Sequence, residues 1–155
     1  MGCGDTLLTL SANAKINLTL DILGTREDGY HEVAMIMQEI SLHDTLSMGK
    51  INQGISLTIV IEGQQGTLPA DESNLCWKAA ALVQKEYNLQ EGVEIHLTKR
   101  IPMAAGLAGG SADAAAVLKG MNHLFRLGMT EARLCELGAR LGSDIPFCIM
   151  GGTML

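Results

Sequence analysis

Aromatic side chains are scarce in this chain, since Phe, Trp and Tyr together make up 3% of its 155 residues. Hydrophobic residues nevertheless reach 47%, so the core must be built from Ala, Leu, Ile, Val and nine Met. Basic residues are also in deficit, with 11 Lys and Arg against 17 Asp and Glu and a net charge of −6. This balance argues against a general nucleic-acid or membrane-surface binder. The length suits one domain.

Paired cysteines and zinc-like clusters are absent from the sequence as well. No C-x-x-C pair occurs, and Met35 stands where the zinc-protease pattern H-E-x-x-H, begun by His31-Glu32, needs its second histidine. No apolar run reaches the roughly 18 residues of a membrane-spanning helix. We therefore expect a cytoplasmic protein with four reduced thiols. These are Cys3, Cys76, Cys135 and Cys148.

Glycine, in contrast, is concentrated in residues 101–114, which read IPMAAGLAGGSADA and lead into an Ala-rich segment typical of a helix. Glycine permits positive φ and close approach of a ligand to the backbone. The first turn of a helix has unpaired N–H groups and a partial positive charge. The segment is therefore a candidate phosphate cradle, for which Lys99 and Arg100 could supply local positive charge. A connection that merely permits tight packing is the alternative.

Three better-known glycine motifs do not fit this segment. The P-loop requires Lys and then Ser or Thr after its last glycine, whereas Ser111 follows Gly110 directly. The dinucleotide fingerprint requires a different glycine spacing. The esterase elbow requires glycine two residues after the serine, where this chain has Asp113.

Alternating hydrophobicity predicts several strands. They cover residues 6–12, 14–23, 31–48 (in one or two pieces), 55–62 and 93–98. In residues 14–23 we expect one buried apolar face and one polar face. The apolar face would carry Ile16, Leu18, Leu20 and Ile22, and the polar face Lys15, Asn17, Thr19 and Asp21.

Helical periodicity and capping signals predict three helices. The first covers residues 74–87 with Ser73 as a candidate N-cap, and the second covers residues 111–126. Thr130 caps the third, which ends near Gly142. Residues 143–147 are expected to form a loop, and the tail from Cys148 a strand. Because the strands come first and mix with helices later, the pattern favours an α+β fold.

The glycine-rich segment also carries a family resemblance. Pro102-x-x-x-Gly106-Leu107-Ala108-Gly109-Gly110-Ser111-Ala112 resembles the ATP-binding loop of the GHMP kinases, which include galactokinase, homoserine kinase and mevalonate kinase. Three further segments resemble the members that phosphorylate a cytidine diphosphate-linked methylerythritol in the non-mevalonate isoprenoid pathway. They are Ala14-Lys15-Ile16-Asn17-Leu18, Asp28-Gly29-Tyr30-His31-Glu32, and Gly142-Ser143-Asp144-Ile145-Pro146-Phe147 with Gly151-Gly152-Thr153.

The resemblance implies a fold and roles for individual residues. The fold would be ribosomal protein S5 domain 2-like, a mixed or antiparallel sheet with helices on one face. Asp144 would be the catalytic base, Lys15 its cationic neighbour, and Asn17 would lie beside the reacting hydroxyl. Tyr30 would stack on the cytosine ring, and His31 would hydrogen-bond its edge.

ATP would be the phosphoryl donor, accompanied by Mg²⁺ held largely by the nucleotide and water. Ser111 would add a hydroxyl near the β-phosphate or the metal ion. Asn74 and Lys99 match positions near adenine or phosphate, although Asn74 could equally cap a helix. Asp113 is given no ligand role, since it could simply complement the helix dipole. The remaining ATP-binding residues would be Pro102, Gly106, Leu107, Ala108, Gly109, Gly110 and Ala112.

The resemblance further implies that residues 1–155 are an N-terminal, ATP-binding domain, with a C-terminal domain expected but absent from this sequence. The chain alone is expected to be weakly active or inactive. It is also expected to self-associate if the face that the missing domain leaves exposed is hydrophobic. Two other functions stay open. One is a GHMP kinase of the homoserine or mevalonate type, and the other is a non-catalytic S5-like binding module.

Overall fold

The computed structural model describes the chain apart from residues 1–6, 26, 28–30, 104–105 and 155, and describes only the backbone at residues 19–25, 31–35 and 153–154. Five strands form one sheet: β1 (Leu8–Thr25), β2 (His31–Ile51), β3 (Ile55–Ile61), β4 (Gly92–Lys99) and β5 (Thr153–Met154). Four helices complete the described fold: α1 (Leu75–Glu86), α2 (Gly109–Leu124), α3 (Glu131–Ala139) and α4 (Ile145–Met150).

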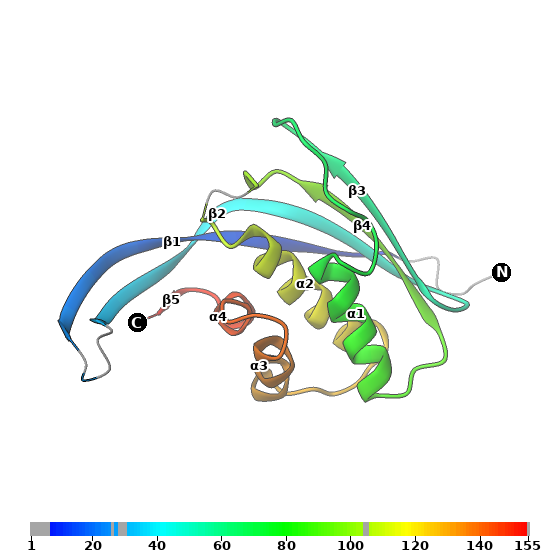
Figure 1. Cartoon of the computed structure of the whole chain (residues 1–155). Helices are drawn as coiled ribbons and strands as arrows, with labels where there is room; N and C mark the ends of the chain where they lie inside the picture. The colour runs from blue at the N-terminus through cyan, green and yellow to red at the C-terminus, as the bar shows by residue number, and fades with distance from the viewer. Residues whose placement is uncertain (1–6, 26, 28–30, 104–105, 155) are drawn as a thin grey trace.

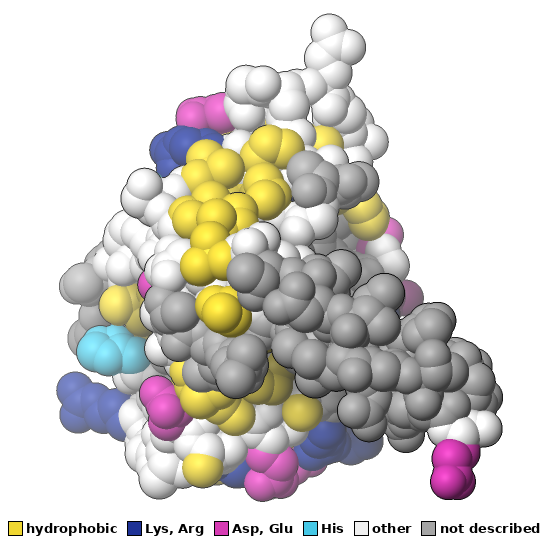
Figure 2. All heavy atoms as spheres, turned by 90° about the vertical axis from the view of Figure 1, so that its left-hand side faces the viewer, with side chains coloured by type: hydrophobic (Ala, Val, Ile, Leu, Met, Phe, Trp, Pro, Cys, Tyr) yellow, Lys and Arg dark blue, Asp and Glu magenta, His cyan; other side chains and the backbone are white. Residues whose placement is uncertain are grey.

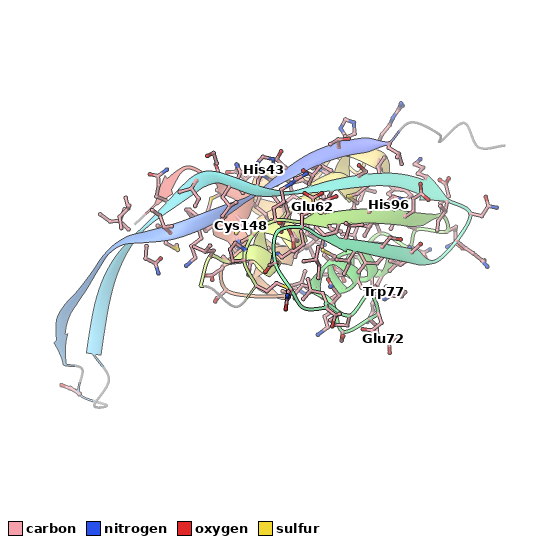
Figure 3. The ribbon with its side chains drawn as sticks, turned by 90° about the horizontal axis from the view of Figure 1, so that it is seen from above. His43, Glu62, Glu72, Trp77, His96 and Cys148 are labelled. Atoms are coloured by element: carbon pink, nitrogen blue, oxygen red, sulfur yellow. The ribbon has the colours of Figure 1, made fainter. Side chains whose placement is uncertain are left out.

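The sheet is mixed, and the helices lie against one of its faces (Figure 1). The strand order is β1-β2-β4-β3, and β5 pairs with β2 beyond the main path. All pairings are antiparallel except β3 with β4, which is parallel. Figure 3 looks down on the opposite face, where His96 of β4 is exposed. The predicted α+β architecture is confirmed.

Strand β1 is continuous where two strands were predicted, and β1 and β2 form a hairpin that extends past the helices (Figure 1). The pairing shifts between Asn13 and Lys15 and again between Asn17 and Thr19. Such bulges change which side chains face the core. Lys15 is only 7% exposed, while Leu18 is 52% exposed. The prediction that Leu18 lies on a buried apolar face was therefore wrong, and Lys15, expected on the polar face, is buried beside Asn17. The side chains of Leu20 and Ile22 lie outside the described residues.

The core lies between the sheet and the alanine-rich helix α2. Seven consecutive residues of α2, from Ala112 to Leu118, are buried, and so are Leu46, Met48, Ile95 and Leu97 of the sheet. Small side chains let the helix approach the strands closely, so the shortage of aromatics leaves no gap. A Cβ on Gly120 would lie 2.4 Å from the Sδ atom of Met48, which shows how close that approach is.

The helix termini agree with the sequence in part. Thr130 caps α3, as predicted, by accepting a hydrogen bond from the Arg133 N–H. Asn74 rather than Ser73 caps α1, because its Oδ1 accepts from the Cys76 N–H at 2.8 Å. Helix α2 begins at Gly109, two residues before its predicted start.

Helix α4 occupies the region where a loop and a strand from Cys148 were predicted, so both predictions were wrong there. Pro146 lies in its first turn, where proline is favoured because no hydrogen bond is lost. Ile145, Phe147 and Ile149 are buried, which stabilises so short a helix through packing. Only Thr153 and Met154 form the strand that follows.

Three buried charged side chains join the sheet to α2. The Lys99 ammonium at the end of β4 lies 2.7 Å from Asp44 Oδ2 on β2 and 2.9 Å from Asp113 Oδ2 on α2. Burial raises the pKa of Asp113 well above its usual value, and the neighbouring Asp44 raises it further. Burial also opposes ionisation of Asp44, but its hydrogen bonds outweigh burial and lower its pKa. The cluster is therefore best described as one ion pair plus a neutral acid at Asp113.

We expect Gly138→Ala to destabilise the fold. The new Cβ would lie 2.7 Å from Ile145 Cγ2 and 3.0 Å from Ile149 Cδ1, forcing α4 away from α3. Overpacking of this kind costs about 1–3 kcal/mol, more than the roughly 1 kcal/mol that alanine adds to a helix. Urea denaturation measures the difference. Gly142→Ala is the control, because its Cβ would lie 3.4 Å from Ile145 Cδ1 and 3.7 Å from Ile145 Cγ1, without a severe overlap. Equal stability of the two variants would contradict the prediction.

We expect Asp113→Asn to change the pH dependence of stability. Because the folded pKa of Asp113 is raised, the native state holds a proton that the unfolded state loses near the usual value of 3.8, so wild-type stability falls as pH rises above it. Asparagine does not titrate, and its amide can replace the neutral acid between Lys99 and Asp44. The variant should gain stability relative to wild type as the pH rises above about 4. Asp71→Asn, at an exposed carboxylate, should show no such gain above about pH 5.

Candidate functional site

A cavity of about 400 Å³ opens between the end of β4, the start of α1 and the glycine-rich segment. Its walls are largely apolar, with Leu68, Leu75, Met103 and Leu107 among them, and Asn74, Lys99 and Asp113 are its polar lining residues that carry amide or charged groups. Such a cavity with few polar groups is typical of a small-molecule site. Figure 2, seen from the side of the hairpin, shows hydrophobic side chains gathered in a band on that face.

The glycine-rich segment lines this cavity with its backbone. Gly106 has φ +73°, and Ala108, at the N-cap of α2, has φ +56°. No side chain in the described part of the chain caps α2, so the N–H groups of its first turn remain open. A Cβ on Gly109 would lie 2.7 Å from Lys99 Nζ. The segment thus needs glycine for packing at one position and offers an open helix N-terminus as well.

Lys15 of β1 lies directly beside this segment. Its backbone N–H donates to the Leu107 carbonyl at 3.1 Å, and its ammonium donates to Asn17 Oδ1 at 3.3 Å. Its cross-strand partner on β2 is Glu39. No carboxylate among the described residues forms an ion pair with the Lys15 ammonium. A buried ammonium with a single amide acceptor is well placed to meet an anionic group.

Asp144 occupies the N-cap position of α4, but its side chain does not cap that helix. The Cys148 thiol lies one turn further along α4 (Figure 3), and its pKa depends on the charges near Asp144. Burial raises the pKa of Cys148 to about 12; Asp144 acts in the same direction, and Lys15 acts against it. Asp144 and Lys15 therefore lie in one region around α4 and β1, although they form no ion pair with each other in the described structure.

The other predicted site residues divide into three groups. Pro102, Asn74, Lys99 and the backbone from Gly106 to Gly110 line the cavity, while Ser111 is half-buried and Ala112 buried in the first turn of α2. Asn17 is exposed beside Lys15. Tyr30 and the side chain of His31 lie outside the described residues.

Lys99 and Arg100, from which local positive charge was expected, both have acidic partners. The Lys99 ammonium contacts Asp44 and Asp113, and Arg100 turns outward to Glu62 and Thr45, at 3.0 Å and 2.7 Å. Asn74 caps α1, which was the alternative considered for it, and it also lines the cavity.

Two acidic residues of the site region were missed. Asp44 shares its strand face with the buried Leu46 and Met48, so a charged residue at an apolar position of the alternation was the available signal. Glu39 is the cross-strand partner of Lys15. No local sequence pattern predicts this pairing, because it depends on the register between β1 and β2.

Metal and membrane features are not evident in the described residues. No group of three or more His, Cys, Asp or Glu side chains there is arranged to hold a metal ion. Nor does any described helix combine the length and apolar character needed to cross a bilayer. The described cysteines, Cys76, Cys135 and Cys148, are free thiols.

Curated relatives match nearly the whole chain. A protein of Acetivibrio thermocellus named 4-diphosphocytidyl-2-C-methyl-D-erythritol kinase is 53% identical over 148 residues, covering 96% of this chain and 51% of its own length. A protein of the same name from Synechococcus sp. is 58% identical over 147 residues, covering 95% of this chain and 46% of its own length. The chain thus spans about half the length of the curated relatives it matches.

Solved structures agree with this match. A crystal structure of 4-(cytidine 5'-diphospho)-2C-methyl-D-erythritol kinase superposes with a TM-score of 0.77 at 37% identity, covering 92% of this chain and 49% of that one. Homoserine kinase from Cytophaga hutchinsonii, with a TM-score of 0.70 at 18% identity over 97% of this chain and 44% of that one, shares the fold. A family model described as the GHMP kinases N terminal domain matches residues 74–152. The chain therefore belongs to the GHMP kinase family.

Proposed function

We propose that the protein carrying this chain transfers the γ-phosphoryl group of ATP to a hydroxyl of a cytidine diphosphate-linked methylerythritol. The observation that carries the proposal is the hydrogen bond from the Lys15 N–H to the Leu107 carbonyl. It joins the strand that bears Lys15 and Asn17 to the loop at the open N-terminus of α2. The names of relatives near 50% identity support the choice of acceptor.

In this proposal the nucleotide occupies the cavity beside the glycine-rich segment. The apolar walls suit a flat base, and the open N–H groups at the start of α2 suit the phosphates. The Lys15 ammonium, free of carboxylate partners among the described residues, then meets the charge that develops on the transferring group. Mg²⁺ would be held by the phosphates, water and at most a side-chain oxygen such as that of Ser111.

Catalysis would depend mainly on positioning, as phosphoryl transfer generally does. Asp144 would accept the proton of the attacking hydroxyl, and Asn17 would orient that hydroxyl. Because the Asp144 side chain does not cap α4, its carboxylate is available for this role. Tyr30 and His31 would hold the cytosine ring. Transfer would be direct, without a phosphoenzyme.

The substrate site would be completed by a C-terminal domain. The relatives are about twice as long as this chain, so the proposal concerns the chain joined to the half that they carry, called the full-length protein below. The 155-residue chain alone should be weakly active or inactive, and the hydrophobic band in Figure 2 is a candidate surface for its self-association.

A substrate panel tests the proposed acceptor. With ATP, the full-length protein should phosphorylate the cytidyl substrate at least about a hundredfold more efficiently than homoserine or mevalonate, because missing base contacts leave polar groups unpaired. ATP consumption and phosphorylated product are measured together, and the 155-residue chain is assayed in parallel. Preference for homoserine or mevalonate would assign another GHMP kinase activity. Binding of RNA at low salt without any transfer would favour the S5-like binding module.

A second experiment tests the role of Asp144. In the full-length protein, Asp144→Asn should lower kcat by at least about 1000-fold, because the asparagine amide cannot accept the proton of the attacking hydroxyl. The Kd for ATP should change less than about threefold, since the carboxylate is not a nucleotide contact in this proposal. Glu136→Gln, at an exposed acid of α3, is the matched control. Turnover close to wild type in Asp144→Asn would remove this residue from the mechanism.

A further inference from the structure

We propose that Asp44 is a positioning residue for the nucleotide-binding segment: its one carboxylate fixes both ends of the loop from Pro102 to Ala108. This inference rests on the proposed function for the identity of the ligand. Asp44 is absent from the cavity lining, so any effect it has on a nucleotide must pass through the groups that it holds.

The first end of the loop is fixed through the backbone. Asp44 Oδ1 accepts hydrogen bonds from the N–H groups of Arg100 at 2.6 Å and Ile101 at 2.8 Å. These residues follow β4 and directly precede Pro102. The carboxylate that holds them comes from β2, more than fifty residues earlier, and is completely buried. The point where the chain leaves the sheet is thereby set by a charge-assisted pair of hydrogen bonds.

The second end of the loop is fixed through Lys99. Asp44 Oδ2 accepts from the Lys99 ammonium at 2.7 Å, and the same ammonium donates at 2.9 Å to Oδ2 of Asp113, which lies in the second turn of α2. Gly109 makes this crossing feasible, because a Cβ there would lie 2.7 Å from Nζ. The start of α2, whose open N–H groups face the cavity, is thus tied to the residues that begin the loop.

Removal of the Asp44 charge would disturb both ends at once. The Lys99 ammonium would keep only Asp113, whose second oxygen, Oδ1, already has no hydrogen-bond partner in the described structure. A buried ammonium that loses one of its two close acceptors tends to reorient toward water. Its movement would loosen the contact that ties Lys99 to α2 and alter the cradle that the phosphates require.

Asp44→Asn in the full-length protein tests this inference. Asparagine keeps the shape and an acceptor for the two N–H groups but presents an amide donor to Lys99. Kd and KM for ATP should each rise by at least about tenfold, while KM for the acceptor stays within about twofold, since the residues proposed to contact the acceptor (Asn17, Tyr30, His31 and Asp144) lie outside this loop. Simple loss of folded protein would lower the active fraction without separating the two KM values.

Glu62→Gln is the matched control. Glu62 pairs with Arg100 at 3.0 Å on the outer side of the same segment, with half of its side chain exposed. An exposed pair of this kind contributes little, so ATP affinity should stay within about twofold of wild type. An Asp44→Asn protein that folds and binds ATP like wild type would overturn the inference. Equal loss of ATP affinity in both variants would overturn it too, because the outer ion pair would then serve equally.

A double variant keeps the test decisive if Asp44→Asn does not fold. Asp44→Asn with Lys99→Met removes the ammonium together with its counter-charge, so no unpaired buried cation remains. It should fold and bind ATP at least about tenfold more weakly, because the tie between loop and helix is lost. Wild-type affinity in the double variant would contradict the inference. Wild type that binds ATP but does not phosphorylate the cytidyl substrate would refute only the proposed function, whereas wild type without ATP affinity would refute both.

Discussion

The Lys99 ammonium is buried where the sheet, the glycine-rich loop and α2 meet, and its burial constrains how these three elements are arranged. A charge taken out of water has to be matched within the fold, and here Asp44 from β2 supplies the counter-charge while Asp113 from α2 supplies a second oxygen acceptor. Because Asp44 and Asp113 come from different elements, their shared contact with Lys99 links β2, β4 and α2. The loop that lines the cavity runs between Lys99 and Asp113, so this cluster constrains its two ends.

The scarcity of large side chains has a structural counterpart. Alanines on α2 and glycines at helix contacts allow backbones to approach closely, and Gly120 and Gly138 lie at two of the tightest contacts. Close packing favours a rigid α2, whose first turn has no side-chain cap in the described structure. Rigid, uncapped helix N-termini suit a reaction in which most of the catalytic effect comes from positioning.

Positive charge near the cavity is arranged unevenly. Lys99 and Arg100 are neutralised by acids, whereas among the described residues the Lys15 ammonium donates to the Asn17 amide oxygen alone. In the proposed function this buried ammonium would meet the incoming anion. The backbone contact with Leu107 joins the loop to the strand that carries Lys15.

The sequence by itself determined much of the local structure. Alternation predicted β3, β4 and the long β2, periodicity predicted α1 and α2, and Thr130 marked the start of α3, because each of these signals involves residues close together in the chain. Ordered motifs, including the glycine-rich segment, also identified the family. The motif residues Lys15, Asn17 and Asp144 were selected from the same pattern.

Only the tertiary structure decided which face of β1 is buried, that residues 145–150 form a helix, and that Lys99 and Arg100 are neutralised. The bulge beside Lys15 depends on pairing with β2, and the short helix α4 depends on packing against α3. Asp44 meets its partners 55 to 57 residues away in the sequence. Strand register and buried charge pairing are set by contacts between distant segments, and a local pattern carries no record of them.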